Sequence, residues 1–268
     1  MARLAILAGT GRLPVELALE CPEALRVGFE GVETALDGPV ERHRFEELGA
    51  LFDTLKAQGV TEVVLAGAMS RPPLDPARFD AYMQATAPRL MQAMQAGDDG
   101  LLRFVISLFE EQGLAVRGAH EVAPALAAGE GLLTGPQPEE RALADADRAA
   151  VILSALAPHD VGQGAVVAGG LCLGIETLQG TDAMLRFVAE TPQALRRGGG
   201  GVLVKRPKPG QDLRADMPAI GPDTIARATE AGLSGVVLEA GRVLILDREA
   251  TLKAAEGAGL FLLGRSFG

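Results

Sequence analysis

A short apolar run in this chain ends in a loop that carries cations and carboxylates together. Val202–Val204 is typical of a strand, and the charged loop runs from Lys205 to Asp216. Prolines and glycines punctuate the segment as far as Pro222, which excludes a regular helix or a central strand. Carboxylates hold hard divalent cations, and Lys and Arg neutralise phosphate oxygens. The loop therefore favours a metal and phosphate site, and a solvated loop with surface ion pairs is the alternative.

Three charged groups in the second half of the chain are the candidate reactive residues. Asp212 and Asp216 could ligate one ion together, or one could ligate while the other activates water, and their spacing does not choose between these roles. Asp182 lies at an expected helix start, where capping is the alternative interpretation. The three groups are Glu176 with Gly180, Thr181 and Asp182; Lys205 with Lys208; and Gln211 with Asp212, Arg214 and Asp216.

The first expected strand is followed by a glycine turn. Leu4–Ala8 is a short buried-strand pattern, and Val15–Leu19 is typical of a helix that follows the Gly9–Gly11 turn. A strand, a turn and a helix N-terminus in this order present backbone N–H groups to an anion. Pro14 occupies the last glycine position of the GxGxxG fingerprint, so the pattern supports a Rossmann-like mononucleotide turn better than a dinucleotide site.

Short strands alternate with helices along the whole chain, which predicts an α/β protein. We expect an N-terminal Rossmann-like domain with a parallel sheet over 1–133 and a C-terminal catalytic domain with a mixed sheet over 138–268. The Gly- and Pro-rich segment Gly131–Pro138 is the expected linker. Further strands are expected at 26–29, 62–66, 115–116, 163–168, 171–176, 235–238, 243–246 and 261–263, and further helices at 45–58, 79–94, 101–112, 139–156, 181–190, 224–231 and 249–256.

Composition bounds the class of protein. A length of 268 residues with 48% hydrophobic content suffices for one large domain or two ordinary ones. The net charge of −10 argues against sequence-independent nucleic-acid binding, which needs clustered Lys and Arg. Cys21 and Cys172 stand alone, which excludes a disulfide framework and a structural zinc site. No apolar run reaches spanning length, and the N-terminal run is too short for a signal peptide, so we expect a cytoplasmic protein.

Five sequence blocks form a recognisable set. In chain order they are GTGRLP at Gly9–Pro14, GAMSRP at Gly67–Pro72, GDDGLL at Gly97–Leu102, IETLQGTDAM at Ile175–Met184 and VLVKRPKPGQDLRADMPAIGP at Val202–Pro222. Together they resemble the UDP-2,3-diacylglucosamine pyrophosphatases of the LpxI type, which serve lipid A biosynthesis. The long last block, in its order after GTDAM, is the specific part of this resemblance.

The resemblance implies a two-domain enzyme that hydrolyses the pyrophosphate of UDP-2,3-diacylglucosamine to UMP and 2,3-diacylglucosamine 1-phosphate. It implies Mg²⁺ or another divalent cation, for which Glu176, Asp182, Asp212 and Asp216 offer hard oxygen ligands. Pyrophosphate hydrolysis also needs water activation and charge neutralisation, so Asp212, Asp216 and Lys205 are the candidate catalytic residues. The resemblance implies substrate contacts from Gly9, Thr10, Gly11, Leu13, Arg71, Asp98, Asp99, Thr181, Gln211 and Arg214. For Asp98 and Asp99, a helix N-terminus is the alternative interpretation.

A substrate with two acyl chains requires an apolar cleft. The Met-rich helix Tyr82–Met94 and the segment Phe104–Phe109 are the candidate walls, and ordinary core or subunit packing is the alternative. We expect weak peripheral contact with the inner membrane, hydrophobic because the negative net charge opposes adsorption to anionic lipid. A homodimer is one of the oligomeric states that the sequence leaves open.

Two other function classes compete with this interpretation. One is an NAD(P)- or nucleotide-binding oxidoreductase that uses the Gly9–Gly11 turn, for which Glu30 and Glu33 are the candidate ribose partners. The other is a non-catalytic module that binds a phosphorylated metabolite and needs neither the carboxylates nor a metal.

Overall fold

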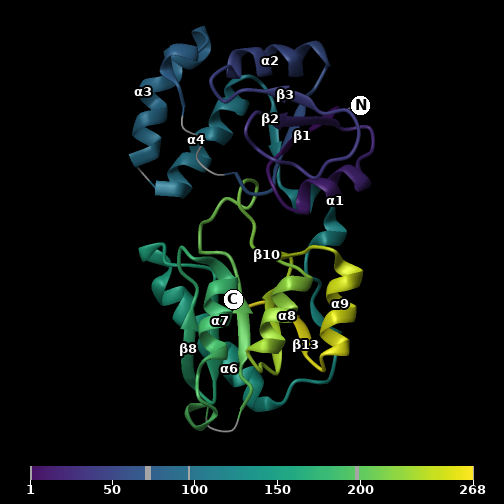
Figure 1. Ribbon diagram of the computed structural model, residues 1–268, viewed down its shortest axis with the longest axis vertical. Helices are drawn as coiled ribbons and strands as arrows, with labels where there is room; N and C mark the ends of the chain where they lie inside the picture. The colour runs from purple at the N-terminus through teal and green to yellow at the C-terminus, as the bar shows by residue number, and fades with distance from the viewer. Residues whose placement is uncertain (1, 70–73, 96, 197–198, 268) are drawn as a thin grey trace. The chain divides into compact units, whose positions relative to one another are not determined.

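The protein is described by a computed structural model that covers residues 2–69, 74–95, 97–196 and 199–267. The chain forms two compact units (Figure 1). The first comprises Met1–Pro124 and the short segment Asp212–Asp216, and the second comprises Ala125–Gln211 and Met217–Gly268. The Gly131–Pro138 segment is not the linker that we expected, because strand β6 (Gly131–Thr134) belongs to the second unit, where it pairs with β13.

The first unit is built on a five-stranded sheet whose strand order is β3-β2-β1-β4-β5. All four strand pairs are parallel. This order and direction are those of the first five strands of a Rossmann fold, so the prediction of a Rossmann-like parallel sheet is confirmed. The strands are β1 (Leu4–Ala8), β2 (Leu25–Phe29), β3 (Glu41–His43), β4 (Glu62–Ala66) and β5 (Ala115–Arg117).

Helices bury the apolar strands of the first unit. In α2 the residues Leu51, Phe52 and Leu55 repeat at helical spacing and face the core. Helices α3 and α4 lie side by side (Figure 1), and Arg89 Nη2 of α3 pairs with Glu111 Oε1 of α4 at 2.5 Å. The helices of this unit are α1 (Leu13–Glu20), α2 (Leu48–Ala57), α3 (Ala81–Gln95), α4 (Gly97–Glu111) and α5 (Ala119–Val122), with a 3₁₀ turn at Pro76–Arg78. A further 3₁₀ turn, Pro124–Leu126, lies at the boundary between the units.

The second unit is built on a six-stranded sheet of order β6-β13-β11-β9-β7-β8. The central pairs β13–β11 and β11–β9 are parallel, whereas β6–β13, β9–β7 and the β7–β8 hairpin are antiparallel, so the prediction of a mixed sheet is confirmed. Its strands are β6, β7 (Gly164–Ala168), β8 (Leu171–Ile175), β9 (Val202–Lys205), β11 (Gly235–Glu239) and β13 (Phe261–Arg265), and β10 (Ala219–Ile220) pairs with β12 (Leu244–Ile245) in a separate small sheet.

Both faces of the second sheet are covered, which explains the continuous buried runs of its central strands β7, β9 and β11. Val166, Leu203 and Val236 point to one face, where they pack with residues of α7, α8 and α9. Their neighbours Val167 and Val202 point to the other face, which α6 covers. The helices are α6 (Glu140–Leu156), α7 (Gly180–Ala189), α8 (Pro222–Glu230) and α9 (Arg248–Gly257), with 3₁₀ turns at Ala157–His159 and Gln193–Leu195.

A buried arginine ties two helix ends together in the second unit. Arg196 is 1% exposed, and its guanidinium donates hydrogen bonds to the carbonyl oxygens of Thr191, Val188 and Ala231. Carbonyls in the last turn of a helix lack intrahelical partners. Arg196 therefore stabilises the C-terminal ends of α7 and α8 against each other.

In the part of the chain that the structure describes, no helix combines the length and the apolar character that crossing a bilayer requires.

Candidate functional site

The carboxyl end of β9 carries Lys205, as the sequence predicts, but its ammonium group is held inside the second unit. Lys205 is 7% exposed, and its Nζ donates a 2.5 Å hydrogen bond to Thr181 Oγ1. Thr181 Oγ1 in turn donates to Glu176 Oε1 at 2.9 Å, and the Lys205 Nζ to Glu176 Oε1 distance is 3.6 Å. Three predicted site residues from separate elements therefore form one buried polar cluster, which we call the Lys205 cluster.

Local backbone geometry explains why Lys205, Thr181 and Glu176 lie close together. Gly180 has a φ of +83°, a conformation that favours glycine, and Thr181 follows it in the first turn of α7. Gly164 lies opposite Lys205 in the antiparallel pair β7–β9. A Cβ on Gly164 would lie 2.5 Å from Glu176 Oε2, so the missing side chain leaves room for the carboxylate. The Glu176 carboxylate therefore balances the Lys205 charge in the interior.

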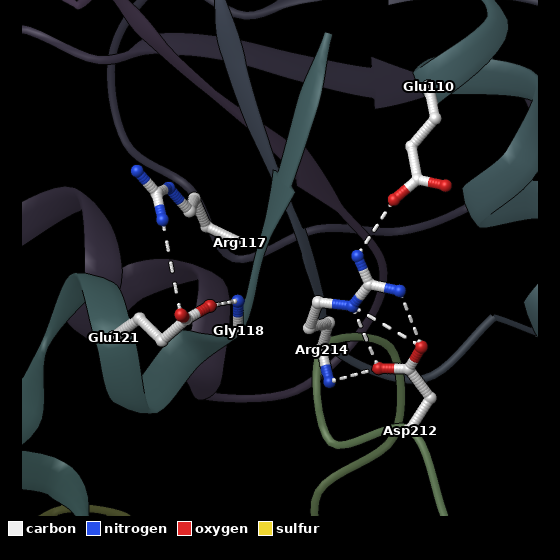
Figure 2. A network of polar contacts seen from close by, with 6 residues as sticks. All are labelled: Glu110, Arg117, Gly118, Glu121, Asp212 and Arg214. Atoms are coloured by element: carbon white, nitrogen blue, oxygen red, sulfur yellow. Dashed lines mark hydrogen bonds and ion pairs between the residues drawn. The ribbon is translucent and has the colours of Figure 1, made fainter.

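A second polar group lies in the first unit, on the segment Asp212–Asp216 (Figure 2). Arg214 donates from Nη2 to Asp212 Oδ2 at 2.7 Å and from Nε to Asp212 Oδ1 at 3.0 Å. Its Nη1 donates to Glu110 Oε1 of α4 at 2.8 Å. Hydrogen bonding to Arg214 lowers the pKa of Asp212 below its ordinary value, and Asp212 with Glu110 raises the pKa of Arg214. We call these three residues the Arg214 cluster.

The segment that carries Arg214 is a tight turn. The backbone N–H groups of Ala215 and Asp216 both donate to Asp212 O at 3.3 Å. This bonding places Asp212 and Asp216 one turn apart, although both lie outside any regular helix. Asp216 is exposed, whereas both oxygens of Asp212 accept hydrogen bonds from Arg214.

Gln211 is the last residue of the charged loop that belongs to the second unit, and its side chain bonds to other residues of that unit. Its Oε1 accepts hydrogen bonds from Lys208 N at 3.0 Å and from Gln163 Nε2 at 2.9 Å. The Lys208 ammonium group pairs with Asp160 Oδ1. These bonds give Gln211 a role in the shape of the loop, and its predicted substrate contact stays a prediction.

The predicted metal ligands are divided between the two units: Glu176 and Asp182 lie in the second unit, and Asp212 and Asp216 lie in the first. No group of three or more His, Cys, Asp or Glu residues suitable for a metal is found among the described residues. Glu176 faces Lys205 and Asp212 faces Arg214, so each of these carboxylates already balances a cation. Asp182 is exposed in the first turn of α7. Within each unit the described residues therefore provide no complete set of divalent-cation ligands, and the Mg²⁺ requirement stays an expectation.

The N-terminal glycine turn packs against the loop after β4. Gly9 N donates to Ala66 O at 2.7 Å, Thr10 N donates to Ala68 O at 2.8 Å, and Ala68 N donates back to Thr10 O at 3.2 Å. A Cβ on Gly9 would lie 2.4 Å from Ala68 O, so the close approach of the two loops requires this glycine. The N–H groups of Gly9 and Thr10 therefore hold the two loops together. Neither group is left to bind an anion, which we expected of this turn from the sequence.

For the other predicted substrate contacts of the first half, the structure gives a position in the fold but no polar contact that assigns a role. Gly11 has a φ of +88° with open space around it, and Leu13 opens α1. Arg71 lies outside the described residues. Asp98 and Asp99 lie in the first turn of α4, as the alternative interpretation predicts, and their side chains lie outside the description.

An apolar cavity of about 260 Å³ lies in the first unit, against the carboxyl ends of β1, β2 and β4. Leu7, Phe29 and Leu65 contribute to it from these strands. Helices α3 and α4 supply most of the remaining wall, which includes Met83, Thr86, Leu90, Phe104, Val105 and Leu108. Residues of the segments Tyr82–Met94 and Phe104–Phe109 line this cavity, and Leu108 and Phe109 also belong to the hydrophobic core of the first unit, as the alternative interpretation predicts. An acyl-chain cleft at this place stays a prediction.

Comparison with known proteins covers the chain from end to end. Residues 3–126 match the LpxI N-terminal domain, and residues 129–263 match the LpxI C-terminal domain. This chain belongs to the LpxI family. A curated relative, UDP-2,3-diacylglucosamine pyrophosphatase LpxI from Caulobacter vibrioides, is 42% identical over 273 residues, which is 98% of each chain.

Two polar groups of this LpxI-family chain escaped sequence reasoning. Glu110 lies on a helix 104 positions before Arg214, and no local pattern joins them. Arg206 Nε pairs with Glu239 Oε2 at 3.0 Å in the interior of the second unit, and its guanidinium lies over the Phe267 ring. Arg206 and Glu239 stand at the carboxyl ends of the neighbouring parallel strands β9 and β11, and this shared strand-end position was the available signal.

Proposed function

We propose that this chain hydrolyses the pyrophosphate bond of UDP-2,3-diacylglucosamine and releases UMP and 2,3-diacylglucosamine 1-phosphate in lipid A biosynthesis. The observation that carries the proposal is the match to the curated LpxI relative over 98% of both chains. The apolar cavity and the two charged clusters support it, because the substrate joins apolar chains to a doubly charged linkage.

Arg214 is the proposed contact for the pyrophosphate. Two carboxylates fix its guanidinium plane, so little side-chain entropy is lost when the guanidinium binds an anion. Lys205 is the second proposed contact, which requires its ammonium group to exchange the Thr181 hydroxyl for a phosphate oxygen.

Asp216 is the proposed group that activates water. Asp212 uses both oxygens on Arg214, so its proposed role is to position that guanidinium. Asp216 lies one turn further along the same segment and is exposed to solvent. A carboxylate beside the pyrophosphate contact has the reach that a general base needs.

A divalent cation is part of the proposal on charge grounds. The Lys205 cluster pairs one cation with one carboxylate, and the Arg214 cluster pairs one cation with two carboxylates. Neither cluster has net positive charge for a pyrophosphate, which supports a cation that accompanies the substrate. No reaction step is assigned to that cation.

The dinucleotide alternative is not favoured. Glu30, which follows β2 at the position of a ribose-binding carboxylate, pairs with Arg44 at 2.7 Å. The N–H groups of Gly9 and Thr10 are bonded to backbone carbonyls. Both observations argue against a nicotinamide dinucleotide at this turn.

The test is direct. Purified protein is incubated with UDP-2,3-diacylglucosamine, with Mg²⁺ or with EDTA, and UMP is measured by chromatography. UDP-N-acetylglucosamine, which lacks acyl chains of this length, serves as the control substrate. The proposal predicts UMP from the diacyl substrate with Mg²⁺, and absence of UMP under both conditions would overturn it.

A further inference from the structure

Lys205 and Arg206 follow each other at the carboxyl end of β9 and reach opposite faces of the second sheet, because successive side chains of a strand alternate between its faces. Lys205 bonds to Thr181 of α7, which covers one face. Arg206 extends to the other face, where its Nη1 donates to Ser154 Oγ of α6 at 3.3 Å. The backbone at this strand end is therefore held from both sides.

The partner of Arg206 on the α6 face is a buried carboxylate. Arg206 Nε pairs with Glu239 Oε2 at 3.0 Å, and the two side chains are 10% and 8% exposed. Glu239 ends β11, the strand that pairs with β9 in parallel. The guanidinium carbon of Arg206 lies 5.3 Å from the centroid of the Phe267 ring. The buried pair of Lys205 and Glu176 on one face is thus matched by a second buried pair on the other, which we call the Arg206 pair.

The Arg206 pair is difficult to explain by stability alone. Taking two charges out of water is costly, and apolar residues of similar volume are often as stabilising as a buried ion pair. A guanidinium offers something that an apolar side chain lacks, because its planar fork fixes direction as well as distance. Arg206 uses this fork, with Nε on Glu239 and Nη1 on Ser154. A role in fixing the geometry of the strand end explains why the pair is buried there.

The Arg206 pair also stands at the start of the charged loop. Arg206 N donates to Gln163 O at 2.9 Å, just before β7. Gln163 also holds the far end of this stretch, because its Nε2 donates to Gln211 Oε1 at 2.9 Å. Pro207 and Pro209 lie between the two ends, and each fixes its own φ. A loop tied at both ends and stiffened between them transmits a shift of Arg206 to Gln211.

We propose that Arg206 and Glu239 are positioning residues for the hydrolysis, which fix the direction of Lys205 and the path of the loop 206–211 without touching the substrate. This inference rests on the proposed function, in which Lys205 contacts the pyrophosphate. Since Lys205 directly precedes Arg206, a rotation of the backbone at Arg206 displaces the ammonium group as well. A misplacement of about 1 Å that begins far from the reacting atoms can lower a rate about a hundred-fold.

Replacing both members of the pair by apolar residues separates positioning from stability. Arg206→Met/Glu239→Leu removes both charges and keeps similar side-chain volumes, so the second unit should stay folded. For UDP-2,3-diacylglucosamine, kcat should nevertheless fall about ten- to a hundred-fold, and KM should change much less. If the pair serves stability alone, the folded double variant keeps the wild-type kcat, and this result would overturn the proposal.

A second variant covers the case in which the double variant fails to fold. Arg206→Lys keeps the charge balance with Glu239 and loses the planar fork and its bond to Ser154. We expect kcat to fall in this variant too, because a point charge does not fix direction. A wild-type kcat in folded Arg206→Lys would overturn the proposal.

Arg265→Met/Asp147→Leu is the matched control. Arg265 Nη2 pairs with Asp147 Oδ1 at 2.7 Å, also between a strand end and α6, but these side chains are 34% and 55% exposed. The control removes the same charges and should keep the wild-type kcat and KM. Thermal unfolding and the hydrogen-exchange protection of β11 verify that each variant is folded. An equal loss of kcat in the control would trace the effect to net charge balance at the surface and overturn the proposal.

Hydrogen exchange separates this inference from the proposed function. The amides at positions 206, 208 and 211 are bonded within the loop or to Gln163, so their protection reports the loop without any substrate. We expect Arg206→Met/Glu239→Leu to lose this protection while β11 keeps its own. Lost loop protection, in a protein that releases no UMP from the diacyl substrate, would support the positioning and refute the proposed function. Unchanged loop protection would refute the positioning, whether or not the protein hydrolyses the substrate.

Discussion

Replacing Lys205 with methionine is expected to destabilise the second unit by about 3–5 kcal/mol, because a buried carboxylate loses its partner. The side chains of Lys205 and Glu176 are 8% and 13% exposed, so water cannot replace the lost ammonium group at Glu176 Oε1. Glu176 Oε2 is buried without a hydrogen-bond partner among the described residues, so removing Lys205 leaves only the Thr181 hydroxyl on this carboxylate.

The double variant Lys205→Met/Glu176→Gln should recover most of that loss. It removes both charges and keeps similar side-chain volumes, and replacing both members of a buried pair is often close to neutral. Lys253→Met on the exposed side of α9 is the matched control and should change stability by less than about 0.5 kcal/mol.

Hydrogen exchange is the appropriate assay, because a chain of two units need not unfold in one transition. Protection of the β9 and α7 amides reports the opening free energy of the second unit directly. Activity is measured on the same variants. If Lys205 contacts the pyrophosphate, the double variant regains protection and remains impaired in catalysis.

Two results would refute the reasoning. If Lys205→Met changes the protection of β9 no more than Lys253→Met does, the pair is not a buried ion pair in solution. The single variant Glu176→Gln completes the cycle. If the losses of Lys205→Met and Glu176→Gln simply add in the double variant, Lys205 and Glu176 do not interact.

Three further predictions concern single residues and the membrane. Arg214 lowers the pKa of Asp212, so the stability that this carboxylate contributes is present above its unfolded value of 3.8 and disappears as the pH falls through the folded value. The difference in urea stability between wild type and Asp212→Asn should therefore be largest near neutral pH and shrink below about pH 4; a constant difference from pH 7 to pH 3 would contradict this. Arg196→Met removes the guanidinium that donates to the carbonyls of Thr191, Val188 and Ala231, of which Val188 O keeps a backbone donor, and it should destabilise the protein by on the order of 2–3 kcal/mol in thermal unfolding, whereas an unchanged Tm would show that water replaces the guanidinium. Membrane recovery should be partial, reversed by detergent and insensitive to salt, because the net charge of −10 opposes electrostatic adsorption; release by salt alone would reveal a basic surface instead.

The regular part of the fold could be predicted from the sequence because buried parallel strands are continuous apolar runs. Leu4–Ala8, Glu62–Ala66 and Val202–Val204 end at glycines or charges, and each is a strand in the structure. Strand β3 (Glu41–His43) could not be predicted, since its three polar residues pair only at the edge of the sheet. Strand β6 is hidden in a Gly- and Pro-rich segment, where turn residues dominate the pattern.

The sequence predicted which charged residues belong to the candidate site, but not which side chains they pair with. Charged residues at strand ends pointed to Lys205, Arg214 and Asp212, but their partners depend on contacts between distant parts of the chain. Thr181 and Lys205 are 24 positions apart, and Glu110 and Arg214 are 104 positions apart. Such pairings are set by strand order and helix packing, which no local spacing encodes.

The most direct test of pyrophosphate hydrolysis at the Arg214 cluster is the rate of UMP release from UDP-2,3-diacylglucosamine by matched variants. Wild type is compared with Arg214→Met, Asp216→Asn and, as an exposed control on α7, Arg186→Met. A charge-assisted contact contributes about 1.5–3 kcal/mol, so Arg214→Met should lose about ten- to a hundred-fold in kcat/KM. Asp216→Asn should lose more, through kcat, and Arg186→Met should match wild type. Equal rates of UMP release from all four proteins would contradict the assignment of the site.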